Sequence, residues 1–122
     1  MSDYSKSKPV YDLENRTYQF AKNVRSFIKT IPKTIANNED GKQVVRSSGS
    51  VGSNYIEANE ALSKKDFVMR IKICRKEAKE SRYWLKLIDT EGGIELDRQR
   101  DTLVQESTEL MNIFGAILQK TK

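Results

Sequence analysis

The chain has 122 residues and a net charge of +5, and it combines 32% charged with 37% hydrophobic residues and only six Gly and two Pro. This composition is typical of one helix-rich domain with a single core. The complete lack of histidine excludes Ser-His and Cys-His nucleophile pairs and histidine-based zinc or di-iron sites, and the one cysteine, Cys74, excludes an internal disulfide. We therefore expect a protein that is not an enzyme and holds no metal or other cofactor.

The same sequence features suggest where the protein works. No apolar run approaches the roughly 18 residues that a membrane-spanning helix needs, and the first twelve residues lack the apolar segment of a secretory signal. A single cysteine suits a reducing compartment. We expect a cytoplasmic protein with no membrane partner.

Hydrophobic periodicity divides the chain into a tail and four helices. We expect residues 1–11 to form a flexible N-terminal tail and residues 12–120 to form one four-helix bundle, with helices at about 12–32, 39–61, 63–90 and 95–119. The net charge alternates along the chain, at +4 for residues 1–33, −2 for 34–62, +5 for 63–90 and −2 for 91–122. Short connections favour an antiparallel up-down-up-down arrangement. The predicted fold class is therefore all-α.

The first helix has apolar side chains at three- and four-residue spacing from Leu13 to Ile31. Asp12 is a suitable N-cap, and Pro32 ends the helix because proline cannot donate to the helical hydrogen-bond pattern.

The second helical segment contains an unusual run of small residues, Ser47, Ser48, Gly49, Ser50, Gly52 and Ser53. Each glycine weakens an isolated helix by about 1 kcal/mol, so a loop is the alternative. A helix is favoured because one face at helical spacing is formed by Val44, Ser48, Val51, Tyr55, Ala58 and Leu62. In a helix, the small residues would let a neighbouring helix approach closely.

The third helix begins at Ser63, which resembles a capping box with Asp66, and ends before Gly92 and Gly93. Its core face contains Phe67, Ile71, Cys74, Ala78, Ser81, Leu85 and Ile88. The apolar surface extends further round the helix through Met69, Ile73, Trp84 and Leu87, and is wider than an ordinary apolar stripe. Because one protomer is too small to cover this surface, we expect a homo-oligomer with these four residues at its interface.

The fourth helix is acidic overall. Its apolar stripe is formed by Leu103, Leu110, Phe114, Ile117 and Leu118. It completes the expected bundle.

Three charged residues of the third helix, Arg70, Glu77 and Glu80, project into its apolar surface. A buried charge is costly unless it is paired, and one edge of the second helix offers partners in Arg46, Ser50, Asn54 and Glu57. We expect a buried structural network in which Arg46 pairs with Glu77 or Glu80, and Arg70 with Glu57 or Glu77. The alternatives are an acid-base pair of Glu77 and Glu80, or a carboxylate metal site of Glu57, Glu77 and Glu80, which the lack of histidine disfavours.

The remaining side of the third helix is a basic ridge. It comprises Lys64, Lys65, Lys72, Arg75, Lys79, Arg82 and Lys86, and the first helix adds a shorter basic group of Arg25, Lys29 and Lys33. Such a charge run is either a solvated face or a surface that follows nucleic-acid phosphates, where affinity comes from released counterions.

Two central segments together resemble a family. They are RSSGSVGSNYIEA (46–58) and KKDFVMRIKICRKEAKESRYWLKLI (64–88). This pattern is similar to that of the bacterial four-helix bundle proteins found as reading frames in intervening sequences of 23S ribosomal RNA genes, also described as S23 ribosomal protein-like. The matching positions are Arg46, Ser47, Ser50, Val51, Gly52, Asn54, Glu57 and Ala58, then Lys65, Asp66, Phe67, Lys76, Glu77, Ala78, Glu80, Tyr83, Trp84 and Leu85. The resemblance covers about residues 12–118.

The resemblance implies a fold and an assembly rather than an activity. It implies ring-like homopentamers of antiparallel four-helix protomers, and no catalytic residue. A related branch, the accessory variability proteins of diversity-generating retroelements, implies contact with a reverse transcriptase and with nucleic acid. The leading hypothesis is a non-enzymatic homo-oligomer associated with RNA, or less favourably DNA. The alternative is a scaffold that presents a ring to a protein partner and binds no nucleic acid.

Overall fold

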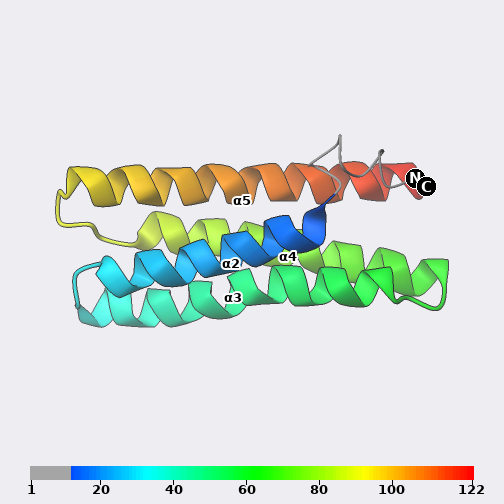
Figure 1. Cartoon of the computed structure of the whole chain (residues 1–122), viewed down its shortest axis with the longest axis horizontal. Coiled ribbons are helices and arrows are strands. Elements are labelled where there is room, and N and C mark those ends of the chain that lie inside the picture. The colour runs from blue at the N-terminus through cyan, green and yellow to red at the C-terminus, as the bar shows by residue number, and fades with distance from the viewer. Residues whose placement is uncertain (1–11) are drawn as a thin grey trace.

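The computed structural model describes residues 12–122, so the expected tail at 1–11 lies outside the described residues. Four helices follow one another: α2 (Leu13–Thr30), α3 (Ile35–Asn59), α4 (Lys64–Leu87) and α5 (Ile94–Lys120). They run antiparallel along one long axis (Figure 1). The predicted all-α four-helix bundle is confirmed. None of these four helices is both long and apolar enough to cross a membrane.

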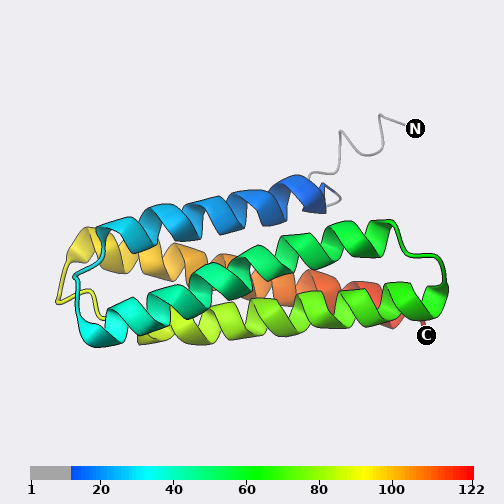
Figure 2. The same ribbon diagram turned by 90° about the horizontal axis from the view of Figure 1, so that it is seen from below.

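The order of the helices round the bundle determines which surfaces adjoin. Helix α3 packs against both α2 and α4, and α5 packs against both α4 and α2. Helices α2 and α4 are therefore diagonal to each other, with α3 and α5 between them (Figure 2).

Side-chain caps set where the helices begin. Asp12 Oδ1 accepts the Asn15 amide at 3.2 Å, and Ser63 Oγ accepts the Asp66 amide at 3.0 Å, as their sequence positions suggested. Helix α3 begins four residues before the expected position 39, because Thr34 Oγ1 accepts the Asn37 amide at 3.0 Å and caps an earlier turn.

Buried Asn37 ties the two connections at one end of the bundle together. Its Nδ2 donates to the carbonyls of Pro32, at 3.0 Å, and Asp89, at 2.8 Å, while its Oδ1 accepts the Asp89 amide at 2.9 Å. The α4–α5 connection then turns through Glu91 and Gly92, which have φ angles of 53° and 80°. The glycine adopts this left-handed conformation without steric penalty.

The core contains residues from all four helices. Its largest fully buried side chains include Phe20, Phe27, Ile71, Leu85 and Phe114. The expected core faces are buried, except for five residues that are only partly buried: Ile28, Tyr55, Phe67, Ile117 and Leu118. Leu62 was expected on the α3 core face but is 99% exposed, because α3 ends at Asn59 and the chain leaves the helical path before Leu62.

The small residues of α3 are helical and bring two neighbouring helices close. On the α2 side, a Cβ added at Gly52 would lie 3.0 Å from Thr17 Oγ1, so α2 approaches the α3 backbone directly. On the α4 side, buried Ser47 and Ser81 share a hydrogen bond of 2.8 Å between their Oγ atoms. The loop alternative for this segment is therefore wrong.

This packing predicts opposite effects of two similar substitutions. Gly52→Ala should lower the free energy of unfolding by about 1–3 kcal/mol, because its methyl group would collide with Thr17 Oγ1, itself bonded to the Leu13 carbonyl at 2.7 Å. Gly49→Ala meets only the flexible Arg25 guanidinium, 3.3 Å away, and should gain up to about 1 kcal/mol from helix propensity. Urea denaturation measures both, and equal stability of the two variants would contradict the proposed close approach.

Cys74 yields a second prediction. The thiol is fully buried and donates to the Val51 carbonyl at 3.4 Å, and burial raises its pKa to about 12, from an ordinary value of 9.0. At pH 8 the folded protein should not react with an aromatic disulfide reagent, since the thiolate is the nucleophile, whereas the unfolded chain should react with one equivalent. The folded state favours the neutral thiol. The contribution of Cys74 to the free energy of unfolding should therefore persist below pH 9 and diminish as the pH rises toward 12. Rapid labelling of the native protein would show that this core is open.

Candidate nucleic-acid interface and the polar face between α3 and α4

The basic ridge lies along the edge where α4 meets α5. Lys72, Arg75, Lys79 and Lys86 are exposed, as are Lys64 and Lys65 at the start of α4. Arg82 is half-buried, and its Nη1 donates to Thr108 Oγ1 of α5 at 3.3 Å. The Arg75 Nε lies 3.8 Å from where a Cβ would stand on Gly115 of α5. The two arginines thus lean on α5, while the lysines extend into solvent.

The charges of this ridge are not neutralised by ion pairs within residues 12–122. In residues 12–122, no carboxylate lies within 4.0 Å of a cationic nitrogen of any ridge residue. Carboxylates of neighbouring α5 are engaged elsewhere. Arg16 of α2 contacts Glu106 at 2.7 Å and Glu109 at 2.8 Å. The ridge therefore keeps its positive charge free of internal ion pairs in the part of the chain that the structure describes.

The Arg16 cluster shows how the acidic helix is anchored. The hydrogen bond to Glu106 is the main cause of a raised Arg16 pKa. The pKa of Glu109 is lowered, first by the hydrogen bond from Gln105 and then by Arg16. This cluster on α2 and α5 was not expected from the sequence, although the opposite net charges of those two segments were a signal for it.

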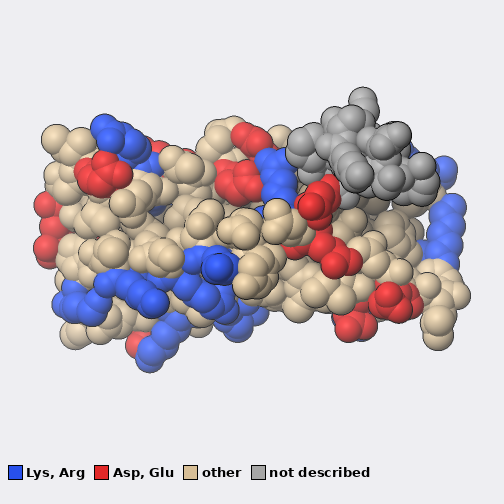
Figure 3. Space-filling view, viewed as in Figure 1, with Lys and Arg blue, Asp and Glu red and all other residues tan. Residues whose placement is uncertain are grey.

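The fold separates the ten basic residues predicted as one nucleic-acid surface into two groups. Arg25, Lys29 and Lys33 belong to α2 and the residues just after it, and α2 is diagonal to α4. Figure 3 shows basic side chains gathered over α2 and α3, toward the end where these two helices are connected. The α2 group therefore cannot extend the basic ridge within one protomer.

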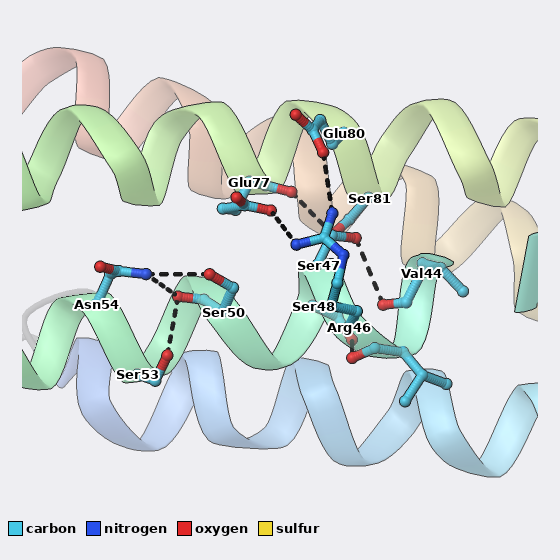
Figure 4. Close-up of polar contacts among 11 residues, drawn as sticks. Val44, Arg46, Ser47, Ser48, Ser50, Ser53, Asn54, Glu77, Glu80 and Ser81 are labelled. Carbon is cyan, nitrogen blue, oxygen red and sulfur yellow. Dashed lines mark hydrogen bonds and ion pairs between the residues drawn. The ribbon is translucent and has the colours of Figure 1, made fainter. Parts of the chain in front are cut away.

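The polar residues between α3 and α4 form two small clusters rather than one network (Figure 4). Arg46 lies 3.2 Å from Glu80 and 3.5 Å from Glu77, as the sequence suggested. Arg70 was expected to pair with Glu57 or Glu77, but it forms an ion pair with neither. Its Nη1 donates to Asn54 Oδ1 at 3.0 Å. The Asn54 Nδ2 in turn donates to the Ser50 carbonyl at 2.9 Å and to Ser50 Oγ at 3.0 Å.

The expected burial of this network is also corrected. The side chain of Arg46 is 54% exposed and that of Glu80 is 39% exposed, whereas Glu77 is buried. Glu57 is exposed and lies in no ion pair among the described residues, because it projects from the outer side of α3. Removing Glu77 would therefore not strand a buried cation, since Arg46 keeps both water and Glu80.

Neither chemical alternative for these carboxylates is supported by their arrangement. Glu77 and Glu80 contact the same guanidinium, and burial closes Glu77 to a substrate. The metal site of Glu57, Glu77 and Glu80 is not assembled, and in residues 12–122 no group of three or more Cys, Asp or Glu residues could hold a metal ion.

The four residues expected at an oligomer interface lie on the outer side of α4. Met69 and Leu87 are 45% and 47% exposed, and Ile73 and Trp84 are half-buried. Exposed Tyr83 packs edge-on against Trp84, with ring centroids 5.0 Å apart, and extends this apolar patch. Tyr83 was not predicted to belong to this surface, although it adjoins Trp84 in the chain.

Two buried polar atoms on this side have no hydrogen-bond partner in the described part of the chain. They are Trp84 Nε1, a donor, and Glu77 Oε1, an acceptor. Arg46 Nη1 is 3.5 Å from Glu77 Oε1, which is an ion-pair contact without hydrogen-bond geometry. Buried polar atoms in native proteins are rarely left without a partner.

The comparisons with known proteins agree on a family. Residues 11–116 match the family described as 23S rRNA-intervening sequence protein. No curated protein sequence matches the chain. Among solved structures, the chain is similar to a protein of unknown function from the S23 ribosomal protein family from Bacteroides thetaiotaomicron. The two are 28% identical with a TM-score of 0.71, over 86% of this chain and 96% of that one.

This match spans all four helices except the last residues of α5, and it includes the residues of the basic ridge and of the polar α3–α4 clusters. The chain therefore belongs to the 23S rRNA-intervening sequence protein family.

Proposed function

We propose that this protein is a non-enzymatic homo-oligomer that binds RNA through the basic ridge of α4. The observation that carries the proposal is that the ridge cations have no carboxylate partner among the described residues. Surface cations that are free of internal ion pairs can exchange counterions for phosphates, which is the main source of sequence-independent nucleic-acid affinity.

The spacing of the ridge supports a phosphate-tracking role. Its central cations recur every three or four residues from Lys72 to Lys86, so they line about 21 Å of helix. A linear polyanion can contact several of them at once. RNA is favoured over DNA by the family's description, which connects its members with 23S ribosomal RNA genes.

Oligomer formation is supported by the outer side of α4. A second copy of the chain would cover the exposed apolar side chains of Met69, Tyr83 and Leu87. Each added protomer would bring another basic ridge, so that individually weak phosphate contacts multiply along one RNA. Homopentamers, as the family resemblance implies, would carry five ridges.

The alternative function is a scaffold that presents its assembled surface to a protein, such as a reverse transcriptase, and does not bind RNA. The exposed apolar residues of α4 support it as well, because they suit a protein partner. The two functions differ in what happens when the charge of the ridge is reversed.

Reversing two ridge charges should abolish most RNA affinity. The double variant Lys72→Glu, Lys79→Glu should raise the dissociation constant for RNA about tenfold or more, because two phosphate contacts become repulsions. The slope of log affinity against log salt should become shallower by about 1.4–1.8. Fluorescence anisotropy at several salt concentrations measures both quantities.

The matched control is Lys120→Glu, Lys122→Glu at the end of the chain. It makes the same change in net charge at two exposed lysines outside the ridge. If the two double variants lost RNA affinity equally, the effect would come from net charge and not from the ridge. Absence of RNA binding by the unmodified protein, with the oligomer intact, would favour the scaffold.

A separate prediction concerns assembly. Met69→Glu combined with Leu87→Glu should convert the oligomer to a 14.0 kDa protomer, because two charges would be buried in its apolar contact. Light scattering after size-exclusion chromatography measures the mass. Ile94→Glu is the control, since Ile94 is 77% exposed at the start of α5, away from the patch. A 14.0 kDa particle for the unmodified chain at every concentration would overturn the proposed oligomer.

A further inference from the structure

A groove runs between α2 and α3, on a different edge of the bundle from the basic ridge. It has a volume of about 380 Å³, and residues of its lining include Tyr18, Lys22 and Arg25 from α2 and Gly49, Gly52 and Ile56 from α3. The two glycines contribute no side chain to its lining, which leaves room for the groove. The groove is thus a consequence of the small-residue packing between α2 and α3.

The wall of this groove combines an exposed aromatic ring with cations that form no ion pair among the described residues. Tyr18 is 57% exposed and Ile56 is 50% exposed, although both are large apolar side chains. The Lys22 ammonium lies over the Tyr18 ring, 5.4 Å from its centroid, in a cation–π contact that a stacked base would replace. The Arg25 Nη2 lies 3.3 Å from where a Cβ would stand on Gly49.

The basic group continues away from the groove along α2. Lys22, Arg25, Lys29 and Lys33 follow at spacings of three, four and four residues, and in residues 12–122 none has a carboxylate within 4.0 Å. The groove's carboxylate, Glu14, stands toward the other end of α2, where it accepts from Asn59 Nδ2 at 2.9 Å. A bound anionic chain would therefore run from the groove toward Lys33, along the cations, and away from the negative charge of Glu14.

An aromatic face beside a line of cations fits an unpaired nucleotide. Bases of single strands stack on aromatic side chains irrespective of sequence, while cations follow the phosphates. In a duplex the base faces are already stacked and cannot reach Tyr18. The cations of the α4 ridge contact phosphates, which paired and unpaired RNA both present, and the exposed Tyr83 beside them packs edge-on against Trp84.

We propose that the α2–α3 groove is a second RNA site, specific for single strands, in which a base stacks on Tyr18 and the following phosphates contact Lys22, Arg25 and Lys29. This inference rests on the proposed function in taking RNA as the ligand. It adds a distinct surface and a requirement for unpaired nucleotides, neither of which the ridge supplies.

Three substitutions of one residue test the stacking contact. Binding of a labelled oligouridine and of an RNA duplex of equal length would be measured by fluorescence anisotropy for Tyr18→Ala, Tyr18→Leu and Tyr18→Phe. The Ala and Leu variants should lose about 5- to 100-fold in affinity for oligouridine, whereas Phe keeps a π-face and should stay within about twofold. Affinity for the duplex should be unchanged in all three variants.

The controls separate base stacking from loss of folding and from simple apolar contact. Because Tyr18 is exposed, all three variants should melt at the temperature of the unmodified protein, which circular dichroism checks. Full affinity in the Leu variant would overturn stacking and indicate a groove for an apolar protein segment. Equal losses for single strand and duplex would overturn the specificity for unpaired nucleotides.

The same measurements distinguish failure of this inference from failure of the proposed function. If Lys72→Glu, Lys79→Glu loses RNA while Tyr18→Ala binds oligouridine normally, the groove is not an RNA site and the ridge remains one. If Tyr18→Ala loses affinity for oligouridine while the ridge variant keeps its affinity for RNA, the groove is an RNA site and the ridge is not. If the unmodified protein binds neither RNA, both proposals fall.

Discussion

The close contact of α3 with two neighbouring helices is the constraint on which the rest of the structure depends. Gly52 lets Thr17 of α2 approach the α3 backbone, and Ser47 bonds Ser81 of α4 across the other side. A helix with so few large side chains contributes little apolar area of its own and is intrinsically weak. Its stability must therefore come from neighbours that pack directly on its backbone. The groove between α2 and α3 lies beside this contact and includes Gly49 and Gly52 in its lining.

The carboxylates of α5 are paired with cations inside the protomer, whereas the cations of the α4 ridge have no carboxylate partner among the described residues. The carboxylates Glu106 and Glu109 of α5 turn toward Arg16 of α2, which leaves none of them beside the cations of α4. Had the acidic helix paired with its other neighbour instead, the ridge would be a set of surface ion pairs worth little to stability and nothing to polyanion binding. The diagonal position of α2 and α4 thus separates the internal use of cations from their external use.

Periodicity and caps were sufficient to predict the helices, because both depend on residues near in the chain. Asp12 and Ser63 cap as expected, but the cap at Thr34 was missed because no apolar residue of the following turn reaches the core, and Ile35 is 86% exposed. The ion pairs of Arg46 with Glu77 and Glu80 were predictable from the helix faces alone. The hydrogen bond of Arg70 to Asn54, in place of an ion pair with Glu57, was not predictable, since it depends on the rotation of α3 about its axis.

The sequence was least informative about which surfaces adjoin. Two basic groups were recognised and predicted to form one site, but they lie on the diagonal helices α2 and α4. Which helices are adjacent in a bundle depends on their order round its axis and not on spacing in the chain. Tyr18 was also given no weight, because a single exposed tyrosine has no periodic signal. Only the groove formed with α3 gives that ring a setting in which an exposed aromatic side chain can bind a ligand.

The three surfaces differ in how readily another protomer could cover them. Covering the ridge or the α2 group would remove cations from water without a carboxylate to receive them, and such desolvation costs several kcal/mol per ion. The outer side of α3 and α4 carries fewer such cations, because Arg46 already contacts Glu77 and Glu80 there, although exposed Lys76 lies in no ion pair among the described residues. Electrostatics therefore opposes assembly through the ridge or the α2 group more strongly than assembly through this outer side. Assembly there would leave both cationic surfaces in solvent, as the proposed binding of RNA by an oligomer requires.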